Sequence, residues 1–192
     1  MGLEFLPVET PSQIDELADM ANRIWHEYWP DIIGKDQTDY MIDMFQSVSA
    51  ITRDIQQHNY RYWFVVDDGK KVGFTGGAIE EMTDDADHNA FIHHSDVVDT
   101  RWPRRFFISK VYLYADERGK HYSSRVLDFY EQFCRNNNLP VMYLTVNREN
   151  DLGVRAYKGR GFDTVDQVDN PIGRGYVMND YIMAKEIAPV QA

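Results

Sequence analysis

The chain has little cysteine and no long hydrophobic run. Its one cysteine, Cys134, excludes an internal disulfide and is typical of proteins from a reducing compartment. The longest apolar run, Tyr62 to Val66, is far shorter than the roughly 20 residues that a membrane-spanning helix needs. The first residues also lack the basic and apolar segments of a signal peptide. We therefore expect a cytoplasmic protein without a membrane partner.

An overall excess of positive charge is also missing. The chain carries 31 acidic and 20 basic side chains, a net charge of −11. Binding to DNA or RNA depends on cationic neutralisation of phosphates, so we expect no nucleic-acid partner. The charge is uneven, since residues 1–100 hold 20 acidic and 6 basic side chains and residues 101–192 hold 11 and 14. This division favours a cationic ligand on the first half and an anionic ligand on the second.

The composition is that of an ordinary globular protein. Hydrophobic residues make up 43%, aromatic residues 14% and charged residues 27% of 192 residues, which is enough apolar surface for a core of its own. No repeat, low-complexity tract or linker interrupts the chain. We therefore expect residues 1–192 to form one domain.

The first half predicts a strand, three helical segments and a hairpin. Alternation predicts a strand over Glu4–Val8, and Thr10 with Gln13 predicts a capping box ahead of a helix that Pro30 ends. A second helix is expected after residue 36, and a further helical piece around residues 51–58. An Asp68-Gly69 turn predicts a hairpin over residues 61–79. The acid-rich residues 80–99 show no clear period.

The second half alternates between strands and helices. Strands are expected over residues 106–114, 141–146, 162–168 and 176–185, and helices over 123–137 and 151–160. The apolar run 141–146 is typical of a central strand covered on both faces. The whole order, β-α-α-β-β-β-α-β-α-β-β, predicts an α/β or α+β fold with a mixed sheet and helices on its faces.

The strongest local feature joins the strand 106–114 to the following helix. A helix N-terminus offers unpaired N–H groups to a pyrophosphate, and residues 101–125 hold 7 basic against 2 acidic side chains. Neither a Walker P-loop nor a dinucleotide-binding fingerprint fits, because only Gly119 is present. The segment reads Arg118, Gly119, Lys120, His121, Tyr122, Ser123, Ser124.

This segment resembles the phosphate-binding loop of the GNAT superfamily of acetyl-CoA-dependent N-acetyltransferases, with pattern Arg/Gln-x-x-Gly-x-Gly/Ala. His121 stands where glycine is usual, and Ser123 where glycine or alanine is usual. If the backbone at His121 needs a positive φ, the side chain of His121 crowds the phosphates. If the side chain instead lies beside the phosphates, it donates a hydrogen bond to them. The resemblance implies a central mixed, mostly antiparallel sheet of six to seven strands, flanked by helices.

A second motif of that family follows the strand 141–146. Asn150, Gly153, Tyr157 and Gly161-Phe162 match its pattern of Asn, a small residue, Tyr and Gly-Phe. The resemblance implies that Tyr157 protonates the departing thiolate and that the backbone of Leu113 stabilises the oxyanion. It also implies acetyl-CoA as co-substrate, held at Val111, Leu113, Arg118, Gly119, Lys120, His121, Tyr122, Ser123, Ser124 and Asn150. The chain's last strand is similar to that of the bacterial polyamine (spermidine/spermine) branch.

The general base has no obvious counterpart. Ser109 aligns with the family's usual glutamate and cannot deprotonate an ammonium. Other residues with suitable side chains remain open as bases, as does catalysis by positioning without a dedicated base. They are His26, Glu27, Glu80, Glu81, His93 and His94.

The acidic segment also carries metal-ligand side chains. They lie within eleven residues, but mixed carboxylates and histidines in a loop fix no geometry, so we expect no metal there. A solvated loop or a lid that recruits the acceptor is the preferred interpretation. The residues are Asp84, Asp85, Asp87, His88, His93 and His94.

Acetyl transfer to a small cationic amine such as a polyamine is the function that these observations favour. The acidic first half motivates this acceptor, because acidic clefts concentrate cations. Two alternatives stay open: acetylation of a protein N-terminus or lysine, and a CoA-binding module without catalysis. Edge strands and many aromatic residues also permit a homodimer.

Overall fold

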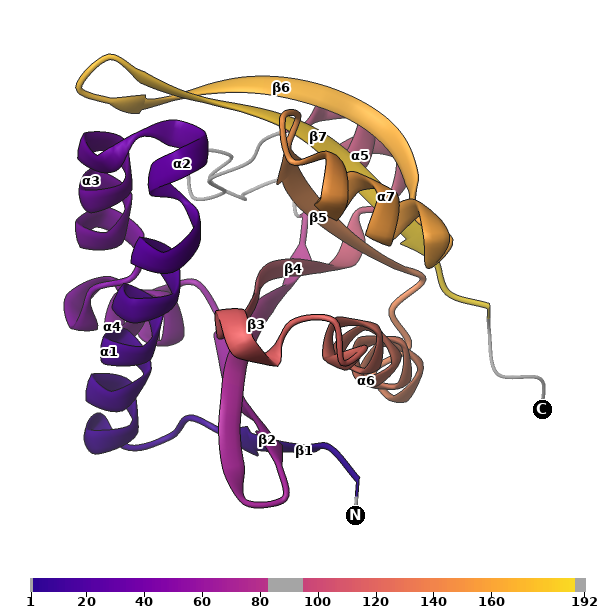
Figure 1. Cartoon of the computed structure of the whole chain (residues 1–192). Helices are drawn as coiled ribbons and strands as arrows, with labels where there is room; N and C mark the ends of the chain where they lie inside the picture. The colour runs from indigo at the N-terminus through magenta and orange to yellow at the C-terminus, as the bar shows by residue number, and fades with distance from the viewer. Residues whose placement is uncertain (1, 83–94, 189–192) are drawn as a thin grey trace. The chain divides into compact units, whose positions relative to one another are not determined.

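The computed structural model describes residues 2–82 and 95–188 (Figure 1). The acid-rich segment from Asp84 to His94, with its metal-ligand side chains and the candidate bases His93 and His94, lies outside these residues. Seven strands form one sheet in the order β1-β2-β3-β4-β5-β7-β6. The strands are β1 (Glu4–Pro7), β2 (Tyr60–Asp67), β3 (Lys70–Glu81), β4 (Arg104–Leu113), β5 (Val141–Asn147), β6 (Asp163–Gly173) and β7 (Tyr176–Glu186).

Most strand pairs are antiparallel. β1 with β2, β2 with β3, β5 with β7 and β6 with β7 all run antiparallel, whereas β4 and β5 are parallel. The helices are α1 (Pro11–Tyr28), α2 (Pro30–Ile33), α3 (Lys35–Phe45), α4 (Val48–Gln57), α5 (Asp96–Arg101), α6 (Tyr122–Asn136) and α7 (Asp151–Gly159), with a 3₁₀ turn η2 (Ala115–Glu117). The expected mixed, mostly antiparallel sheet flanked by helices is confirmed.

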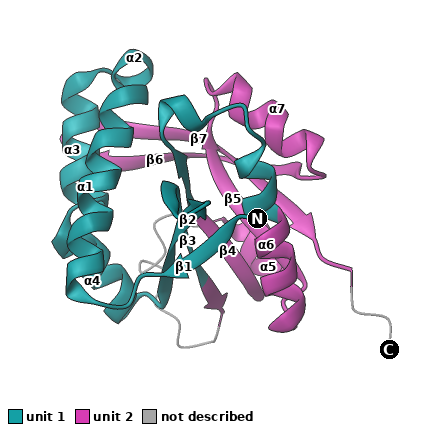
Figure 2. Cartoon of the chain, turned by 60° about the horizontal axis from the view of Figure 1, so that its bottom comes forward, with its two compact units in different colours: residues 1–78, 110–127 teal, residues 79–109, 128–192 magenta. Residues whose placement is uncertain are grey.

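The chain divides into two compact units, coloured separately in Figure 2. Unit 1 comprises residues 1–78 and 110–127, and unit 2 comprises residues 79–109 and 128–192. β3, β4 and α6 each contribute residues to both units. Within unit 1, α1 contacts α2, α3 and α4, and α4 contacts β2. None of the described helices is long and apolar enough to span a membrane.

Local chemistry explains the start of α1 and the hairpin. The Thr10 side chain accepts from the N–H of Gln13 at 3.3 Å, and the Gln13 side chain accepts from the N–H of Thr10 at 2.9 Å, which completes the expected capping box. Asp68 and Gly69 both have positive φ, 46° and 80°. Two such residues make the type I′ turn that suits two-residue hairpins, so the expected hairpin is confirmed.

Three elements differ from the sequence-based expectation. Pro30 ends α1 but also starts the short helix α2, since proline suits a first helical position. The helix α5 begins at Asp96, at the end of the acid-rich segment that showed no clear period, because Ser95 caps it by accepting from the N–H of Val98. β6 continues to Gly173, beyond the expected end near residue 168, because β7 pairs with it along this length.

Candidate functional site

β4 ends in unit 1 beside an unusually close part of β3. A Cβ atom added to Gly73 would lie 2.9 Å from Leu113 Cα and closer still to the carbonyl oxygen of Tyr112. The neighbouring strand therefore requires a glycine here. Thr75 Oγ1 donates to the carbonyl of Lys110 at 2.6 Å, and the N–H of Tyr114 donates to the carbonyl of Val72 at 3.1 Å. Val111 and Leu113, the two β4 residues expected to contact the co-substrate, are half-buried on this strand.

The loop after η2 has two residues in the left-handed region. Gly119 has φ 79° and His121 has φ 63°. A histidine in this conformation is strained, because its Cβ crowds the following carbonyl. His121 therefore has the positive φ at which its side chain was expected to crowd a phosphate. Residues 118–121 are all exposed, so a ligand can reach this loop.

The N-terminus of α6 directly follows the loop. The carbonyl of His121 accepts from the N–H of Arg125 at 3.3 Å, so the helix begins at this point. The N–H groups of a first helical turn have no partner within the helix. The first turn of α6 also contains no acidic side chain. Ser123 is exposed and Ser124 half-buried, so the positive end of the helix is open to an anion.

The basic side chains of the loop have their own partners. Lys120 Nζ donates to Glu117 Oε2 at 2.7 Å, and Lys70 pairs with the other oxygen of Glu117. These hydrogen bonds lower the pKa of Glu117. Arg118 stacks its guanidinium over the ring of Tyr28 of α1, 4.8 Å from the centroid. Glu117 and Tyr28 therefore hold the two cations beside the loop.

Tyr122 anchors α6 rather than facing solvent. Its side chain is buried, and its hydroxyl donates to Asp67 Oδ2 at 2.6 Å. This hydrogen bond, with burial, raises the pKa of Tyr122 to about 12. Asp67 ends β2, so the bond ties the start of α6 to the hairpin. The backbone of Tyr122, not its phenol, is the group available to a ligand.

The second motif caps both ends of α7 in unit 2. Asn150 Oδ1 accepts from the N–H of Gly153 at 3.0 Å, as an N-cap does. A Cβ atom on Gly153 would lie 2.8 Å from Asn150 Nδ2, so a glycine gives this cap its room. Asn150 thus has a structural role in the helix, in addition to any contact with a co-substrate.

Tyr157 belongs to the C-terminal cap of the same helix. Gly161 has φ 83° and donates to the carbonyl of Lys158 at 3.0 Å, and the N–H of Phe162 donates to the carbonyl of Tyr157 at 3.1 Å. This is a Schellman motif, in which the residue after the glycine also packs against the last turn. The rings of Tyr157 and Phe162 meet edge to face, 5.8 Å between centroids. The motif spacing therefore fixes the position of the half-buried Tyr157 ring.

Glu27 is the candidate base that lies beside the end of β4. Its Oε2 accepts from the N–H of Ala115 at 3.1 Å, two residues after Leu113, and its side chain is exposed. His26, its neighbour on α1, binds Asp39 instead, 2.9 Å from Nε2 to Oδ1. Both residues belong to unit 1.

Glu80 and Glu81, in unit 2, are bound to arginines. The buried Glu80 accepts from Arg105 Nε and from the hydroxyl of Tyr143, both at 2.7 Å. Burial raises the pKa of Glu80, while Arg105 and Tyr143 oppose this rise. Glu81 accepts from Arg104 Nε at 2.7 Å. Glu80 is therefore a structural ion-pair partner within the core.

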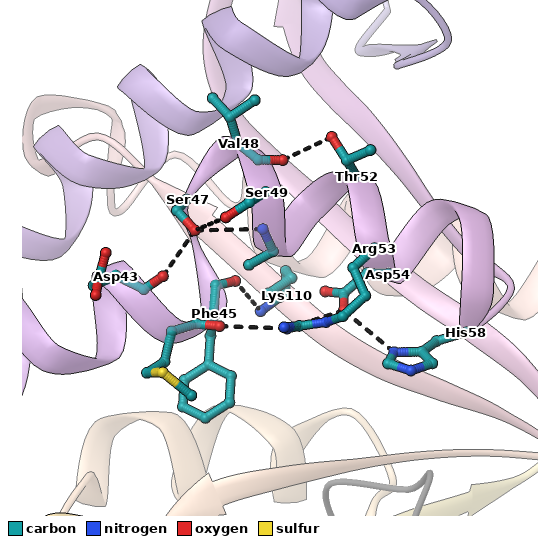
Figure 3. Close-up of polar contacts among 12 residues, drawn as sticks. Asp43, Phe45, Ser47, Val48, Ser49, Thr52, Arg53, Asp54, His58 and Lys110 are labelled. Atoms are coloured by element: carbon teal, nitrogen blue, oxygen red, sulfur yellow. Dashed lines mark hydrogen bonds and ion pairs between the residues drawn. The ribbon is translucent and has the colours of Figure 1, made fainter.

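Lys110 is a charged residue that the sequence analysis overlooked. It lies on β4, is 7% exposed, and its Nζ is 3.4 Å from the carbonyl oxygen of Phe45 (Figure 3). Burial lowers the pKa of Lys110 to about 8, although Asp54 opposes the shift. Asp54 in turn accepts from the hydroxyl of Tyr62 at 2.9 Å. In the sequence, Lys110 stands out as a single lysine within the apolar strand 106–114, and this could have indicated a buried ammonium.

Taken together, a strand end, a left-handed turn and an exposed helix N-terminus follow one another in unit 1, and such an arrangement suits an anion. The model of the acetyltransferase (GNAT) family matches residues 18–162. The chain therefore belongs to the GNAT family, and it is an acetyl-CoA-dependent N-acetyltransferase. A search of curated proteins found no match.

Solved structures share the fold at low identity. PaiA N-acetyltransferase of Thermoplasma acidophilum, in complex with coenzyme A, is 16% identical, with TM-score 0.68 over 97% of this chain and 99% of that one. NAA60 of Arabidopsis thaliana, with a bisubstrate analogue, is 16% identical, with TM-score 0.63 over 97% and 98%. An aminoglycoside 6′-acetyltransferase type Ii is 16% identical, with TM-score 0.57 over all of both chains. Only the last of these three names states an acceptor, and all three identities are low, so these structures support the fold and not an acceptor for this chain.

Proposed function

We propose that this chain transfers an acetyl group from acetyl-CoA to a small cationic amine, and that residues 1–192 act as one domain. The observation that carries the proposal is the conformation of the loop 118–121 in unit 1. Its left-handed residues Gly119 and His121 lead into the open N-terminus of α6. A pyrophosphate there would accept from the N–H groups of residues 122–124 and gain from the helix dipole.

The remaining roles follow from the chemistry of the transfer. The amine nitrogen attacks the thioester carbonyl carbon, and the C–S bond breaks as the C–N bond forms. Val111 and Leu113 would contact the thioester arm, with the N–H of Leu113 donating to the oxyanion. The hydroxyl of Tyr157 would give its proton to the departing thiolate. Each of these assignments is a proposal that rests on the family resemblance and on the half-buried positions of the residues.

We assign the base to Glu27. An alkylammonium with a pKa near 10.4 is almost fully protonated at neutral pH, so its proton must leave before attack. The Glu27 carboxylate is exposed and lies 3.1 Å from the N–H of Ala115, beside the end of β4. It would take the ammonium proton directly or through one water molecule. This role fills the gap left by Ser109.

The acceptor class follows from charge. The first 100 residues hold 20 acidic and 6 basic side chains, and an acidic surface concentrates cations. A polyamine of the kind that the bacterial polyamine branch acetylates is our preferred acceptor. The same carboxylates that attract an ammonium raise its pKa, which is a further reason for a base such as Glu27.

A panel of amines, assayed by release of free CoA thiol, tests the acceptor. We expect turnover with spermidine and spermine, and weaker turnover with an aminoglycoside or with a peptide that has a free N-terminus. Turnover of the peptide but not of any polyamine would replace the proposal with the protein-acetyltransferase alternative. Binding of CoA without turnover of any amine would leave the binding module as the correct interpretation.

A further inference from the structure

β7 carries a buried carboxyl group in unit 2. Asp180 is 3% exposed, and burial raises its pKa to about 6. In the part of the chain that the structure describes, no group donates a hydrogen bond to this side chain and no cation forms an ion pair with it. Acidic side chains are almost never buried to this extent unless they are paired. The contacts among the described residues therefore leave the burial of Asp180 unexplained.

Arg148 acts on Asp180 but is bound elsewhere. Its positive charge partly offsets the effect of burial on the pKa of Asp180. The guanidinium of Arg148 pairs with Asp169 of β6, which also accepts from Asn179 Nδ2 at 2.7 Å. Successive side chains of a strand point to opposite faces of the sheet, so Asp180 and its neighbour Asn179 face opposite ways. Arg148 and Asp169 therefore neutralise each other on the face away from Asp180.

The strand register identifies the neighbours of Asp180. Asn147, at the end of β5, lies directly opposite it, and Val168 lies opposite it on β6 (Figure 2). Side chains at such paired positions share one face, with Cβ atoms about 5 Å apart, and Ile182 shares this face two residues further along β7. Asn147 is neutral, and its Oδ1 accepts from the N–H of Glu149 at 2.9 Å. The surroundings of Asp180 are thus apolar or uncharged.

The carboxyl group of Asp180 is open to a small ligand. Neither of its oxygens is among the unpartnered polar atoms that the described residues enclose completely, so the exposed part of Asp180 includes its carboxyl group. A metal ion would need further ligands, and the described residues include no group of three or more His, Cys, Asp or Glu side chains that could hold one. An ammonium group needs only the carboxylate, and the methylenes attached to it suit the apolar side chains of Val168 and Ile182.

The end of β5 connects this carboxyl group to the second motif. The carbonyl of Asn147 accepts from the N–H of Asn150 at 2.9 Å, and Asn150 caps α7. α7 carries Tyr157, which is the proposed acid of the transfer. All of these residues belong to unit 2. Asp180 thus lies opposite the strand end from which the chain runs directly into the helix of the proposed acid.

We propose that Asp180 binds an ammonium group of the acceptor, and that this group is not the nitrogen that is acetylated. The reacting nitrogen must be neutral when it attacks the thioester, and a carboxylate paired with it would keep it protonated. A second nitrogen stays charged throughout the transfer and can remain paired with Asp180. The inference rests on the proposed acetyl transfer and adds to it the residue that selects acceptors with two nitrogens.

Two acceptors that differ by one nitrogen, 1,4-diaminobutane and butylamine, test this role in the assay of thiol release from acetyl-CoA. We expect the wild type to prefer the diamine by at least about tenfold in kcat/KM, because a hydrogen bond between charged groups at a buried site contributes about this factor or more. Asp180→Asn should lose the preference through a lower kcat/KM for the diamine. Its kcat/KM for butylamine and its KM for acetyl-CoA should stay close to the wild-type values.

A control variant and a measurement of stability separate this role from damage to the sheet. Asp163→Asn changes an exposed carboxylate of β6 and should keep the wild-type preference. The melting temperature of Asp180→Asn should hold or rise, because asparagine has the same shape and carries no charge to bury.

Each outcome of the acceptor comparison bears on a different claim. A wild type without a preference for the diamine, or a preference that survives in Asp180→Asn, would overturn the inference and leave the proposed transfer intact. Equal losses with both acceptors would show that Asp180 serves the structure of the sheet, which would also overturn the inference. If the wild type released no thiol with any amine, the proposed function itself would fail, and the inference with it.

Discussion

Lys110 should make the stability of this protein rise with pH. Burial lowers its pKa from 10.5 to about 8 in the folded chain. Between these two values the unfolded chain binds more protons than the folded chain, so the free energy of unfolding increases as the pH rises. A difference of about 2.5 pKa units corresponds to about 3 kcal/mol. Below pH 8 the folded chain keeps a buried ammonium and lacks this stabilisation.

The variant Lys110→Met isolates this effect. Methionine keeps the apolar length of the side chain and cannot titrate, and other titrating groups cancel when wild type and variant are compared. Between pH 7 and pH 10.5, urea unfolding should show that the free energy of unfolding of the wild type rises by about 3 kcal/mol relative to that of Lys110→Met. The control Lys158→Met changes an exposed lysine of α7. Its free energy of unfolding should differ from that of the wild type by an amount that does not vary with pH.

If the free energies of unfolding of the wild type and Lys110→Met differ by the same amount at every pH from 7 to 10.5, the reasoning is refuted. Such a result would mean that Lys110 titrates with an ordinary pKa and that β4 does not bury its ammonium against α3 and α4. The result also bears on function, because Lys110 directly precedes Val111 on the strand that is proposed to contact the thioester arm.

Three further predictions concern the site. His121→Gly should raise the free energy of unfolding by about 0.5–1 kcal/mol, since relief of the left-handed strain exceeds the added entropy of the unfolded chain; urea unfolding would show no gain if φ at His121 were negative. Gly73→Ala should destabilise the chain by about 3 kcal/mol, because its Cβ would press on the backbone at Tyr112 and Leu113; an unchanged melting temperature would contradict the close approach of β3 and β4. Glu27→Gln should keep the hydrogen bond to Ala115 but lower kcat by about 100-fold and remove the acidic limb of the pH profile of kcat/KM. The control Glu16→Gln, on the same helix, should change neither kcat nor the pH profile. A Glu27→Gln profile that keeps its acidic limb would exclude Glu27 as the base.

Elements with strong local signals were predictable from the sequence. The capping box of Thr10 and Gln13 and the Asp68-Gly69 turn satisfy backbone groups through neighbours in the chain, and both appear in the structure. The buried strand over residues 141–146 was predictable for the same reason, since a continuous apolar run needs cover on both faces. The family match over residues 18–162 confirms the assignment that these elements and the motifs suggested.

Features that depend on tertiary contacts were not predictable. α5 is one short helix in an acid-rich segment, and its Ser95 cap also donates to Asp166, far away in the sequence. The lone lysine in the apolar strand is visible in the sequence, but its contact with the carbonyl of Phe45 in α3 depends on tertiary packing that no local pattern reveals.

The motif residues were predictable as a set, but their structural roles were not. Asn150 and Gly161 cap α7, so their spacing reflects helix geometry as well as ligand binding. Asp15 with Asp19 and Asp39 with Asp43 repeat at helical spacing, but only the packing of α1 against α3 shows that both pairs line one surface groove.

The most direct test of the central claim compares the wild type with Tyr157→Phe in thiol release from acetyl-CoA with spermidine as acceptor, and in CoA affinity by calorimetry. Phenylalanine keeps the ring that packs on Phe162 and removes the proton that the thiolate needs. We predict that the wild type turns over and that the variant loses about 100-fold in kcat while binding CoA equally well. Equal rates in the two proteins, or no turnover by the wild type with any amine, would contradict the account.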